Sequence, residues 1–466
     1  MSNKPKSFDA IIVGSGQGGN PLALALADKG WEIALVERAY VGGSCINYGC
    51  TPTKTMIASA RIAHLIHRAQ DYGINSAAGT VNFSKIQKRK NDIVKSFRDG
   101  NWKKLTSKSN ITLIEGNARF TGKKLLEISL SKGGKQTIKS EYIIIDTGTS
   151  PAKPPIPGLD KVNALDSTSI MEIDKIPEHL LIIGGGYVGL EFGQMFHRFG
   201  SKVTIVQLED QLLPLEDKDV AEEITKILQQ EGLQILLKAN TTNIEFSERD
   251  KIILSVKVNG KAETIEGSHL LVATGRVPNT SFLNPASTGI TLDKKGFIPV
   301  NDYLETSILG IFAIGDVKGG PAFTHVSYDD HKILLKNFLE RGKATISGRL
   351  LPYVVYTDPQ LGRIGLNEKQ AKQGGYDYRI AKIPMSWVAR AIETDETKGF
   401  MKAIVNHKTK QILGAAILGI EGGELMSAIQ IAMLGNLPYT ALHHGMFAHP
   451  TLTESFNTLF GSVEDI

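Results

Sequence analysis

The sequence predicts an α/β protein in which one β-turn-α-β unit occurs twice and an α+β domain follows. Two glycine-rich turns support the prediction, because each lies between a short apolar run and a helical pattern, within residues 10–37 and 180–206. Near residue 350 the pattern changes to alternating strands (353–356, 400–406, 411–419) and an amphipathic helix (424–435). A chain of 466 residues is long enough for two or three domains.

The first glycine turn follows the apolar run Ala10–Val13 and reads GSGQGG. Gly14, Gly16 and Gly19 suit the tight turn, the close approach of a pyrophosphate and the packing of helix on strand. The next apolar run ends at Glu37, about twenty residues further on, where a carboxylate can bind a ribose diol. We therefore expect a dinucleotide at this turn.

The second glycine turn follows the apolar run Leu180–Ile183 and reads GGGYVG. It has the same three fingerprint positions, Gly184, Gly186 and Gly189. Gln207 stands where the first unit has its acid. Two Rossmann-like nucleotide-binding units indicate two nucleotides, and the simplest interpretation is a tightly held flavin and an exchanging nicotinamide that together pass a hydride.

The only two cysteines, Cys45 and Cys50, lie soon after the first turn, in the segment GGSCINYGCTPTK. One regular helix would hold their Cα atoms roughly 8–9 Å apart, beyond the ~7 Å limit for a disulfide. Gly49 and Pro52 permit an irregular helix start, so a bridge becomes feasible. No signal peptide or membrane span is evident, which indicates a cytoplasmic protein. In a reducing compartment such a pair is more often catalytic or metal-binding than structural.

The net charge is +5, and basic residues gather within residues 85–108. A solvated helix face is favoured there over a nucleic-acid-binding face, because acidic residues are nearly as numerous overall. We expect neither a nucleic acid nor a membrane as partner, and no resident metal site.

Proline-rich residues 150–158 indicate a linker, and two strand-then-turn segments, LLVATGRVPN and IFAIGD, lead back toward the first domain. These features predict four parts. They are residues 1–150 as the first part of an FAD-binding domain, 151–270 as an NAD(P)H-binding domain, 271–345 as the second part of the FAD-binding domain, and 346–466 as a dimerisation domain.

Six motifs together resemble the class I pyridine nucleotide–disulfide oxidoreductases, which include lipoamide dehydrogenase, glutathione reductase and mercuric reductase. In order they are GSGQGG, GGSCINYGCTPTK, GGGYVGLE, ATGRVPN, AIGDV and HPTLTE, and they cover essentially the whole chain. FTHVSYDD and HPTLTESFNTLF are most similar to a bacterial mercuric-reductase-like branch, which includes a flavin reductase of reactive-chlorine resistance. One departure is Asp146, where the family usually has alanine; we expect it to be buried beside the flavin.

The resemblance implies that Cys50 is the thiol against the flavin and that Cys45 is the interchange thiol that attacks the substrate. Near a helix N-terminus, Cys50 would have a stabilised thiolate, which is the reactive form. Lys54 and Glu191 would form an ion pair beside the flavin that favours the reduced cofactor.

His449 with Glu454 resembles the family's acid–base pair, in which a carboxylate fixes the histidine tautomer. In the family this pair reaches the cysteines of the other subunit, so the resemblance implies a homodimer with a shared active site.

The same motifs imply further cofactor-binding residues. Tyr187 is similar to the aromatic residue that covers the flavin until the nicotinamide arrives, and Asp316 to the acid that binds the ribityl chain. The remaining candidates are Gly43, Ser44, Thr147, Gly148, Gly275, Arg276 and Gly315.

NADH is favoured over NADPH, which remains an alternative. Gln207 neither binds a ribose diol as an acid does nor binds a 2′-phosphate as arginines do. Glu209 and Asp210 would repel a 2′-phosphate, and no arginine lies nearby in the sequence.

The electron acceptor stays open between a small disulfide and a thiophilic metal ion such as Cu(II) or Hg(II), for which two thiolates are a soft ligand pair. The chain lacks the additional C-terminal cysteine pair of mercuric reductase, and it has His449, which the mercuric enzymes lack. That histidine favours proton transfer between sulfurs.

We therefore expect an FAD enzyme in which NAD(P)H reduces the flavin, the flavin reduces a Cys45–Cys50 disulfide, and the dithiol reduces the acceptor. One alternative is a dihydrolipoamide dehydrogenase. Another is a flavin diaphorase or oxidase with incidental cysteines, in which Cys45→Ser keeps full activity. A non-enzyme alternative is a redox-sensing nucleotide-binding protein, in which the flavin is absent or does not turn over.

Overall fold

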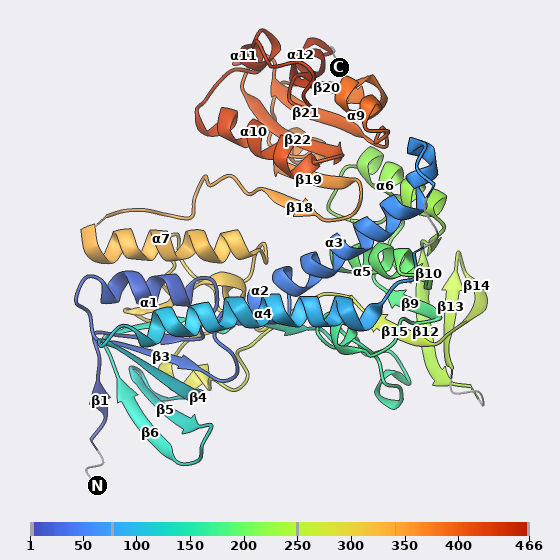
Figure 1. Ribbon diagram of the computed structural model, residues 1–466. Coiled ribbons are helices and arrows are strands. Elements are labelled where there is room, and N and C mark those ends of the chain that lie inside the picture. Colours follow the sequence, from blue (N-terminus) through green and yellow to red (C-terminus); the bar gives the residue numbers. More distant parts are fainter. Residues whose placement is uncertain (1–3, 76–78, 248–250, 341, 464–466) are drawn as a thin grey trace. The chain divides into compact units, whose positions relative to one another are not determined.

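A computed structural model describes the chain except for residues 1–3, 76–78, 248–250, 341 and 464–466 (Figure 1). The chain divides into two compact units, each assembled from three segments. The first unit comprises Met1–Met56, Ser84–Ala152 and Gly275–Arg349, and the second comprises Ile57–Phe83, Lys153–Thr274 and Leu350–Ile466. Residues 57–83, which the sequence analysis assigned to the FAD-binding domain, belong to the second unit, and the predicted NAD(P)H-binding and C-terminal domains share that unit. The four-domain division stays a prediction.

The first unit is built on an eight-stranded sheet of order β1-β6-β5-β4-β3-β2-β7-β17. Its strands are β1 (Lys6–Ser7), β2 (Ala10–Val13), β3 (Ile33–Glu37), β4 (Ile111–Gly122), β5 (Leu125–Leu130), β6 (Lys135–Lys139), β7 (Tyr142–Ile145) and β17 (Ile311–Ala313). The run from β4 through β3, β2 and β7 to β17 is parallel. Strand β2 is buried along its length, as its apolar sequence AIIV predicts for a central parallel strand.

Several helices of this unit carry residues of the sequence motifs. The unit's α-helices are α1 (Gly19–Ala27), α2 (Gly43–Asn47), α3 (Cys50–His67), α4 (Phe83–Thr106) and α7 (Thr324–Glu340), of which α3 and α4 extend across the division between the units. Helices α1 and α7 lie side by side (Figure 1) and share one hydrophobic core with β2 and β3. The first glycine turn lies between β2 and α1, as predicted.

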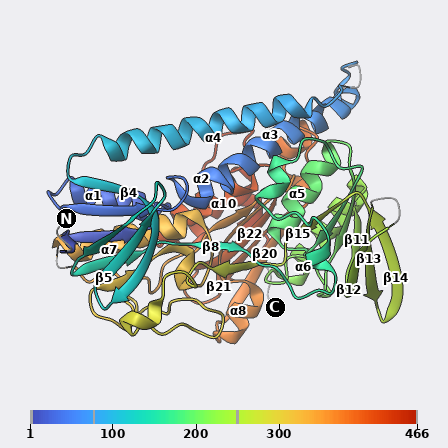
Figure 2. The ribbon, with the colours of Figure 1, turned by 90° about the horizontal axis from the view of Figure 1, so that it is seen from below.

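The second unit contains a parallel sheet of order β11-β10-β9-β15 and an antiparallel sheet of order β12-β13-β14. The strands are β9 (His179–Ile183), β10 (Lys202–Val206), β11 (Gln234–Leu236), β12 (Ala239–Phe246), β13 (Ile252–Val258), β14 (Lys261–Gly267) and β15 (His269–Val272), and the helices are α5 (Tyr187–Arg198) and α6 (Lys218–Glu231). The two sheets lie next to each other (Figure 2) and share a core that includes Leu181, Val206 and Leu254.

The C-terminal part of the second unit is an antiparallel sheet of order β18-β19-β22-β21-β20 with helices packed on it. Its elements are β18 (Tyr353–Val355), β19 (Gln360–Gly365), α8 (Glu368–Gln373), β20 (Tyr378–Pro384), α9 (Ala389–Glu393), β21 (Phe400–Asn406), β22 (Ile412–Gly419), α10 (Gly422–Leu434), α11 (Tyr439–His443) and α12 (Ser455–Gly461). The predicted α+β texture is therefore confirmed, although α10 begins two residues before the predicted start at residue 424.

Two expectations from the sequence were wrong in part. The proposed linker starts inside a strand, because β8 (Thr149–Pro151) pairs with β16 (Arg276–Pro278). The basic residues of α4 are mostly exposed, and Lys88 and Lys95 pair with acids one turn on, but Lys90 is buried.

Among the described residues, no helix combines the length and apolar character needed to cross a membrane.

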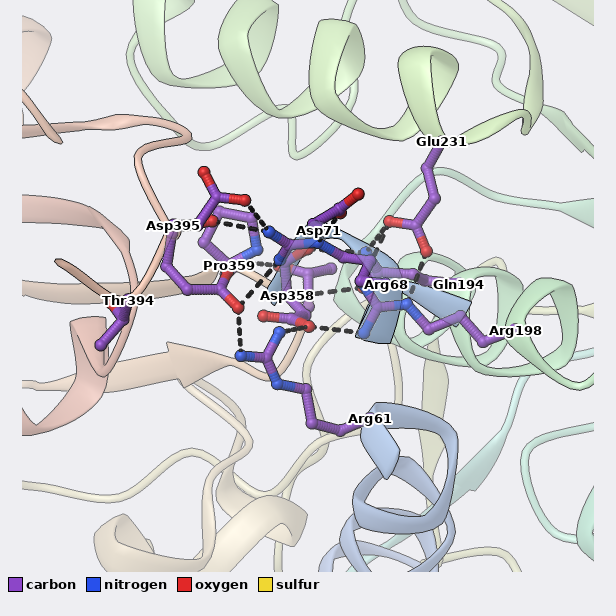
Figure 3. Close-up of polar contacts among 12 residues, drawn as sticks. Arg61, Arg68, Asp71, Gln194, Arg198, Glu231, Asp358, Pro359, Thr394 and Asp395 are labelled. Carbon is purple, nitrogen blue, oxygen red and sulfur yellow. Dashed lines mark hydrogen bonds and ion pairs between the residues drawn. The ribbon is translucent and has the colours of Figure 1, made fainter. Parts of the chain in front are cut away.

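A network of ion pairs inside the second unit joins α3, α5, α6 and the turn before β19 (Figure 3). Arg198 and Arg61 converge on the carboxylate of Asp358, and the Arg198 nitrogen lies 2.5 Å from it. Arg198 also pairs with Glu231 at 2.5 Å, and Arg61 with Glu396 at 2.6 Å. The Arg198 side chain is only 6% exposed, so these charges interact where water screens them weakly.

Candidate active site

The two cysteines lie on either side of an interruption between helices. Cys45 is in α2, which ends at Asn47, and Cys50 is the first residue of α3. The Asn47 side chain stabilises the interruption by donating to the carbonyls of Val41 and Gly43 at 3.0 and 2.9 Å. The irregular start that a disulfide requires at this spacing is therefore present. Cys45 is half-buried and Cys50 is exposed.

The surroundings of the thiols distinguish them. A hydrogen bond with Cys50, burial and the charge of Cys50 raise the pKa of Cys45 far above its usual value, although the Thr324 hydroxyl and Lys54 act in the opposite direction. Cys50 begins an 18-residue helix, whose N-terminus favours a thiolate. Its Sγ lies 3.3 Å from Thr324 Oγ1, at the start of α7. The surroundings of Cys45 therefore disfavour its thiolate, which is the form that attacks.

The first glycine turn has the geometry that a dinucleotide requires. Gly14 has φ +104°, and a Cβ on Gly19 would lie 2.4 Å from the Gly14 carbonyl oxygen. A Cβ on Gly43 would lie 2.6 Å from the Gly16 Cα, so the segment that leads to the cysteines crosses this turn closely. Glu37 Oε2 accepts from the Ser15 amide at 3.0 Å and its hydroxyl at 2.7 Å, which places the acid beside the turn. These residues fit an FAD molecule bound at the N-terminus of α1.

The second glycine turn repeats this construction. Gly184 has φ +113°, and a Cβ on Gly189 would lie 2.1 Å from the Gly184 carbonyl oxygen. Gln207 Oε1 accepts from the Gly185 amide at 2.8 Å, as Glu37 accepts from Ser15 in the first turn. Gln207 thus supports the turn and is buried.

Two glycines of the second turn, Gly189 and Gly186, are expected to respond differently to substitution. Gly189→Ala should destabilise the protein by a few kcal/mol, because its methyl group meets backbone. Gly186→Ala is the matched control: its Cβ meets nothing within 4 Å, so stability should be retained while the backbone loses the close approach to a pyrophosphate. Urea unfolding and nicotinamide nucleotide binding would separate the two effects. Equal stability of the two variants would contradict this assignment.

A further group of predicted residues meets around Thr149. The Thr149 hydroxyl donates to Asp316 at 2.9 Å and accepts from Arg276 Nε at 2.6 Å. The Asn279 side chain donates to the Thr147 carbonyl at 2.9 Å, and the Asn279 backbone N–H donates to the Gly148 carbonyl at 3.0 Å. The structure therefore brings Thr147, Gly148, Arg276 and Asp316 together. Thr149 and Asn279 were not selected from the sequence, although Asn279 ends the ATGRVPN motif.

The remaining candidates are placed individually. Tyr187 is half-buried at the start of α5, Ser44 is exposed in α2, and Gly275 and Gly315 have positive φ. Glu191 is buried and accepts from the Tyr356 amide at 2.9 Å within the second unit. Lys54 belongs to the first unit, so its pairing with Glu191 stays a prediction.

His449 and Glu454 are brought together. The His449 Nδ1 lies 2.9 and 3.1 Å from the two Glu454 carboxylate oxygens. A carboxylate can only accept, so Nδ1 carries the proton and Nε2 is left as the basic nitrogen. The His449 side chain is 67% exposed.

One acidic cluster among the described residues has the spacing of a metal site: Asp217, Asp219 and Glu368. The ammonium group of buried Lys402 already lies 3.1 Å from Asp217 and 3.0 Å from Asp219, and it pairs with Glu368. This cluster is therefore an ion-pair network around a lysine.

Comparisons with known proteins show the family of the chain. The family model described as pyridine nucleotide-disulphide oxidoreductase matches residues 8–330, and the model of its dimerisation domain matches residues 351–460. The chain belongs to the pyridine nucleotide–disulphide oxidoreductase family. As a member of this family it is an NAD(P)H-dependent flavoprotein oxidoreductase that uses FAD and a pyridine nucleotide. The resemblance and the α/β fold class predicted from the sequence are confirmed.

Several relatives span almost the whole chain. A probable pyridine nucleotide-disulfide oxidoreductase, RclA, from Escherichia coli is 37% identical over 98% of this chain and 99% of its own. A mercuric reductase from Staphylococcus aureus is 34% identical over 97% of this chain and 82% of its own. The solved Cu(II) complex of the HOCl-induced flavoprotein disulfide reductase RclA from Escherichia coli covers 98% of this chain and 99% of its own, with a TM-score of 0.89 and 36% identity.

Proposed function

We propose that this oxidoreductase passes electrons from NADH through FAD to the Cys45–Cys50 pair and then to a small disulfide. The observation that carries the proposal is the position of the only two cysteines on either side of a helix interruption, with Cys50 at the N-terminus of α3. Both lie in the unit whose first glycine turn fits FAD. A dithiol of this kind would work in a reducing compartment, which supports a cytoplasmic location.

Gly14, Gly16, Gly19 and Glu37 would hold FAD, which would supply the chemistry that turns hydride transfer from a nicotinamide into an electron pair for the cysteines. The Cys45 sulfur then attacks one sulfur of the substrate disulfide, the substrate S–S bond breaks, and the departing thiolate takes a proton. The Cys50 thiolate attacks the Cys45 sulfur, releases the second substrate thiol and closes the Cys45–Cys50 disulfide. The cysteine pair gives the substrate two electrons; one proton of the two product thiols comes from Cys45, and the other, which the Cys50 thiolate lacks, comes from solvent.

His449 is proposed as the base that accepts the Cys45 proton and returns it to the departing thiolate. Its Nδ1–H is held by Glu454, which leaves Nε2 for proton exchange. Its exposed position suits a residue that acts on another copy of the chain, and residues 351–460 match a dimerisation domain. We therefore propose a homodimer in which each His449 serves the cysteines of the partner subunit.

NADH is proposed as the donor because of the charges after β10. Glu209 and Asp210 are exposed, and both would repel the 2′-phosphate of NADPH. Gln207 already bonds to the Gly185 amide and to the Gln211 carbonyl, at 2.8 and 3.2 Å, so it supports the turn.

A thiophilic metal ion is the second candidate acceptor, favoured by the similarity to a protein solved as a Cu(II) complex. Two Cu(II) ions would each take one electron as the two thiols form a disulfide and release their protons. Two adjacent sulfurs also suit a soft ion such as Hg(II).

The choice between these acceptors is tested by NADH-driven turnover of lipoamide, Cu(II) and Hg(II) by wild type and His449→Ala. For a disulfide reductase, lipoamide turnover is expected to fall about 10²-fold or more in the variant, because proton transfer to the leaving thiolate is lost. Good turnover of metal ions, poor turnover of lipoamide and little effect of the substitution would instead identify a metal reductase.

A further inference from the structure

Asp146 lies at the centre of the first nucleotide-binding turn, where the family resemblance predicts alanine. It follows β7, the strand beside β2, and its amide donates to the Val13 carbonyl at 2.8 Å. Its Oδ2 accepts from the Gly19 amide, at the start of α1, also at 2.8 Å. The residue is 7% exposed, which confirms the predicted burial.

Three glycines leave room for this carboxyl group. A Cβ on Gly16 would lie 2.7 Å from Asp146 Oδ2, and a Cβ on Gly19 would lie 2.9 Å from the same oxygen. A Cβ on Gly315 would lie 3.0 Å from Oδ1. The carboxyl group therefore fills the space between the first glycine turn and the AIGD segment, and both are packed against it.

The charges that face Asp146 are mainly negative. Glu37 approaches from β3, Asp316 from the short helix Gly315–Lys318, and Asp330 from α7. The nearby cations Lys318 and Arg349 both pair with Asp330, at 3.1 and 2.8 Å. Burial raises the pKa of Asp146 well above its usual value; these three acids add to the effect, and the Gly19 amide only partly opposes it.

We propose that Asp146 is a cofactor-positioning residue that supports FAD binding as a neutral acid and weakens it when ionised. The neutral carboxyl group has one acceptor for the Gly19 amide and one O–H donor, so it supports the turn without adding charge. A pyrophosphate bound at the N-terminus of α1 brings two negative charges to the same place. An ionised Asp146 would repel them, so FAD affinity falls as the pH rises through the pKa of Asp146.

The test measures FAD binding to the apoprotein over the pH range in which the protein stays folded, at constant ionic strength, by quenching of flavin fluorescence. Asp146→Asn keeps the shape, the acceptor and a donor, but cannot ionise. The FAD affinity of Asp146→Asn should equal that of wild type at low pH and should not change as the pH rises. The FAD affinity of wild type should fall tenfold or more toward high pH. Asp146→Ala, which also lacks a titrating group, should bind FAD more weakly but with an equally flat profile.

Urea unfolding of the three apoproteins gives a readout that needs no cofactor. The stability of wild type should decline relative to Asp146→Asn as the pH rises, because an acid with a raised folded-state pKa loses its contribution on ionisation. Parallel FAD-binding profiles of wild type and Asp146→Asn would overturn the proposal. If Asp146→Asn does not fold, the profile of Asp146→Ala decides in the same way. The proposal rests on FAD binding alone, so failure of lipoamide turnover leaves it standing.

Discussion

Cys45→Ser is expected to lower NADH-driven disulfide reduction by at least about 10³-fold. A serine hydroxyl cannot form the S–S bond through which the substrate is reduced, and Cys50 alone cannot close an intramolecular disulfide. Stopped-flow and steady-state assays with lipoamide would measure the loss.

The control for Cys45→Ser is electron transfer from NADH to a quinone in the same variant. This activity requires bound FAD and nicotinamide but no thiol, so it should persist. Cys50→Ser should lose disulfide reduction to a similar extent. Full lipoamide activity in Cys45→Ser would contradict the proposed function and favour a flavin diaphorase in which the cysteines are incidental.

Asp358→Asn is expected to reduce the free energy of unfolding by roughly 1–3 kcal/mol at neutral pH, because Arg198 and Arg61 each keep one other anionic partner. The substitution removes the carboxylate on which Arg198 and Arg61 converge, and Arg198 is then left buried with one fewer anionic partner (Figure 3). Asn is nearly isosteric, so the loss reports charge more than shape. Urea denaturation of the two proteins measures the difference.

Asp71→Asn is the matched control for Asp358→Asn. Asp71 pairs with Arg68 at 3.4 Å, but its side chain is 56% exposed, so the substitution should change stability by less than about 1 kcal/mol. Equal effects of the two substitutions would show that burial does not strengthen the network.

The stability that this ion-pair network contributes depends on pH, because the pKa of the Asp358 carboxyl group is shifted. Burial alone would raise the pKa of Asp358, but Arg198 and Arg61 outweigh it and lower the pKa below its usual value. The stabilisation is therefore fully present above the unfolded pKa of about 3.9 and is lost as the pH falls through the folded value. The stability difference between wild type and Asp358→Asn should be constant near neutral pH and shrink below about pH 4.

Local patterns predicted much of the fold and part of the site. The glycine turns could be recognised because strand, turn and helix follow one another within about thirty residues. The helix interruption between Cys45 and Cys50 could be expected from their spacing and from Gly49. The pairing of His449 with Glu454 also lies within one short motif.

Contacts between segments that are far apart in the chain could not be predicted, because no local sequence pattern reports them. Thr324 lies beside Cys50 although 274 residues separate them, and Arg61 meets Asp358 across 297 residues. Strand β8 was missed because its partner, β16, comes only after the whole parallel sheet of the second unit. Lys90 was assigned to a solvated face from charge alone, because composition does not report which side of a helix is packed.

The interleaved segments of the two units impose an order on biosynthesis. Strand β7 is made early, but its outer neighbour β17 and the residues Asp316 and Thr324 follow only after the chain of residues 153–274. At ~5–20 residues per second, a ribosome leaves that edge of the sheet unpaired for on the order of ten seconds. An unpaired strand edge invites pairing with another chain. Nascent chains would therefore be vulnerable to aggregation during this interval, and the cofactor could be loaded stably only after the third segment of the first unit has emerged.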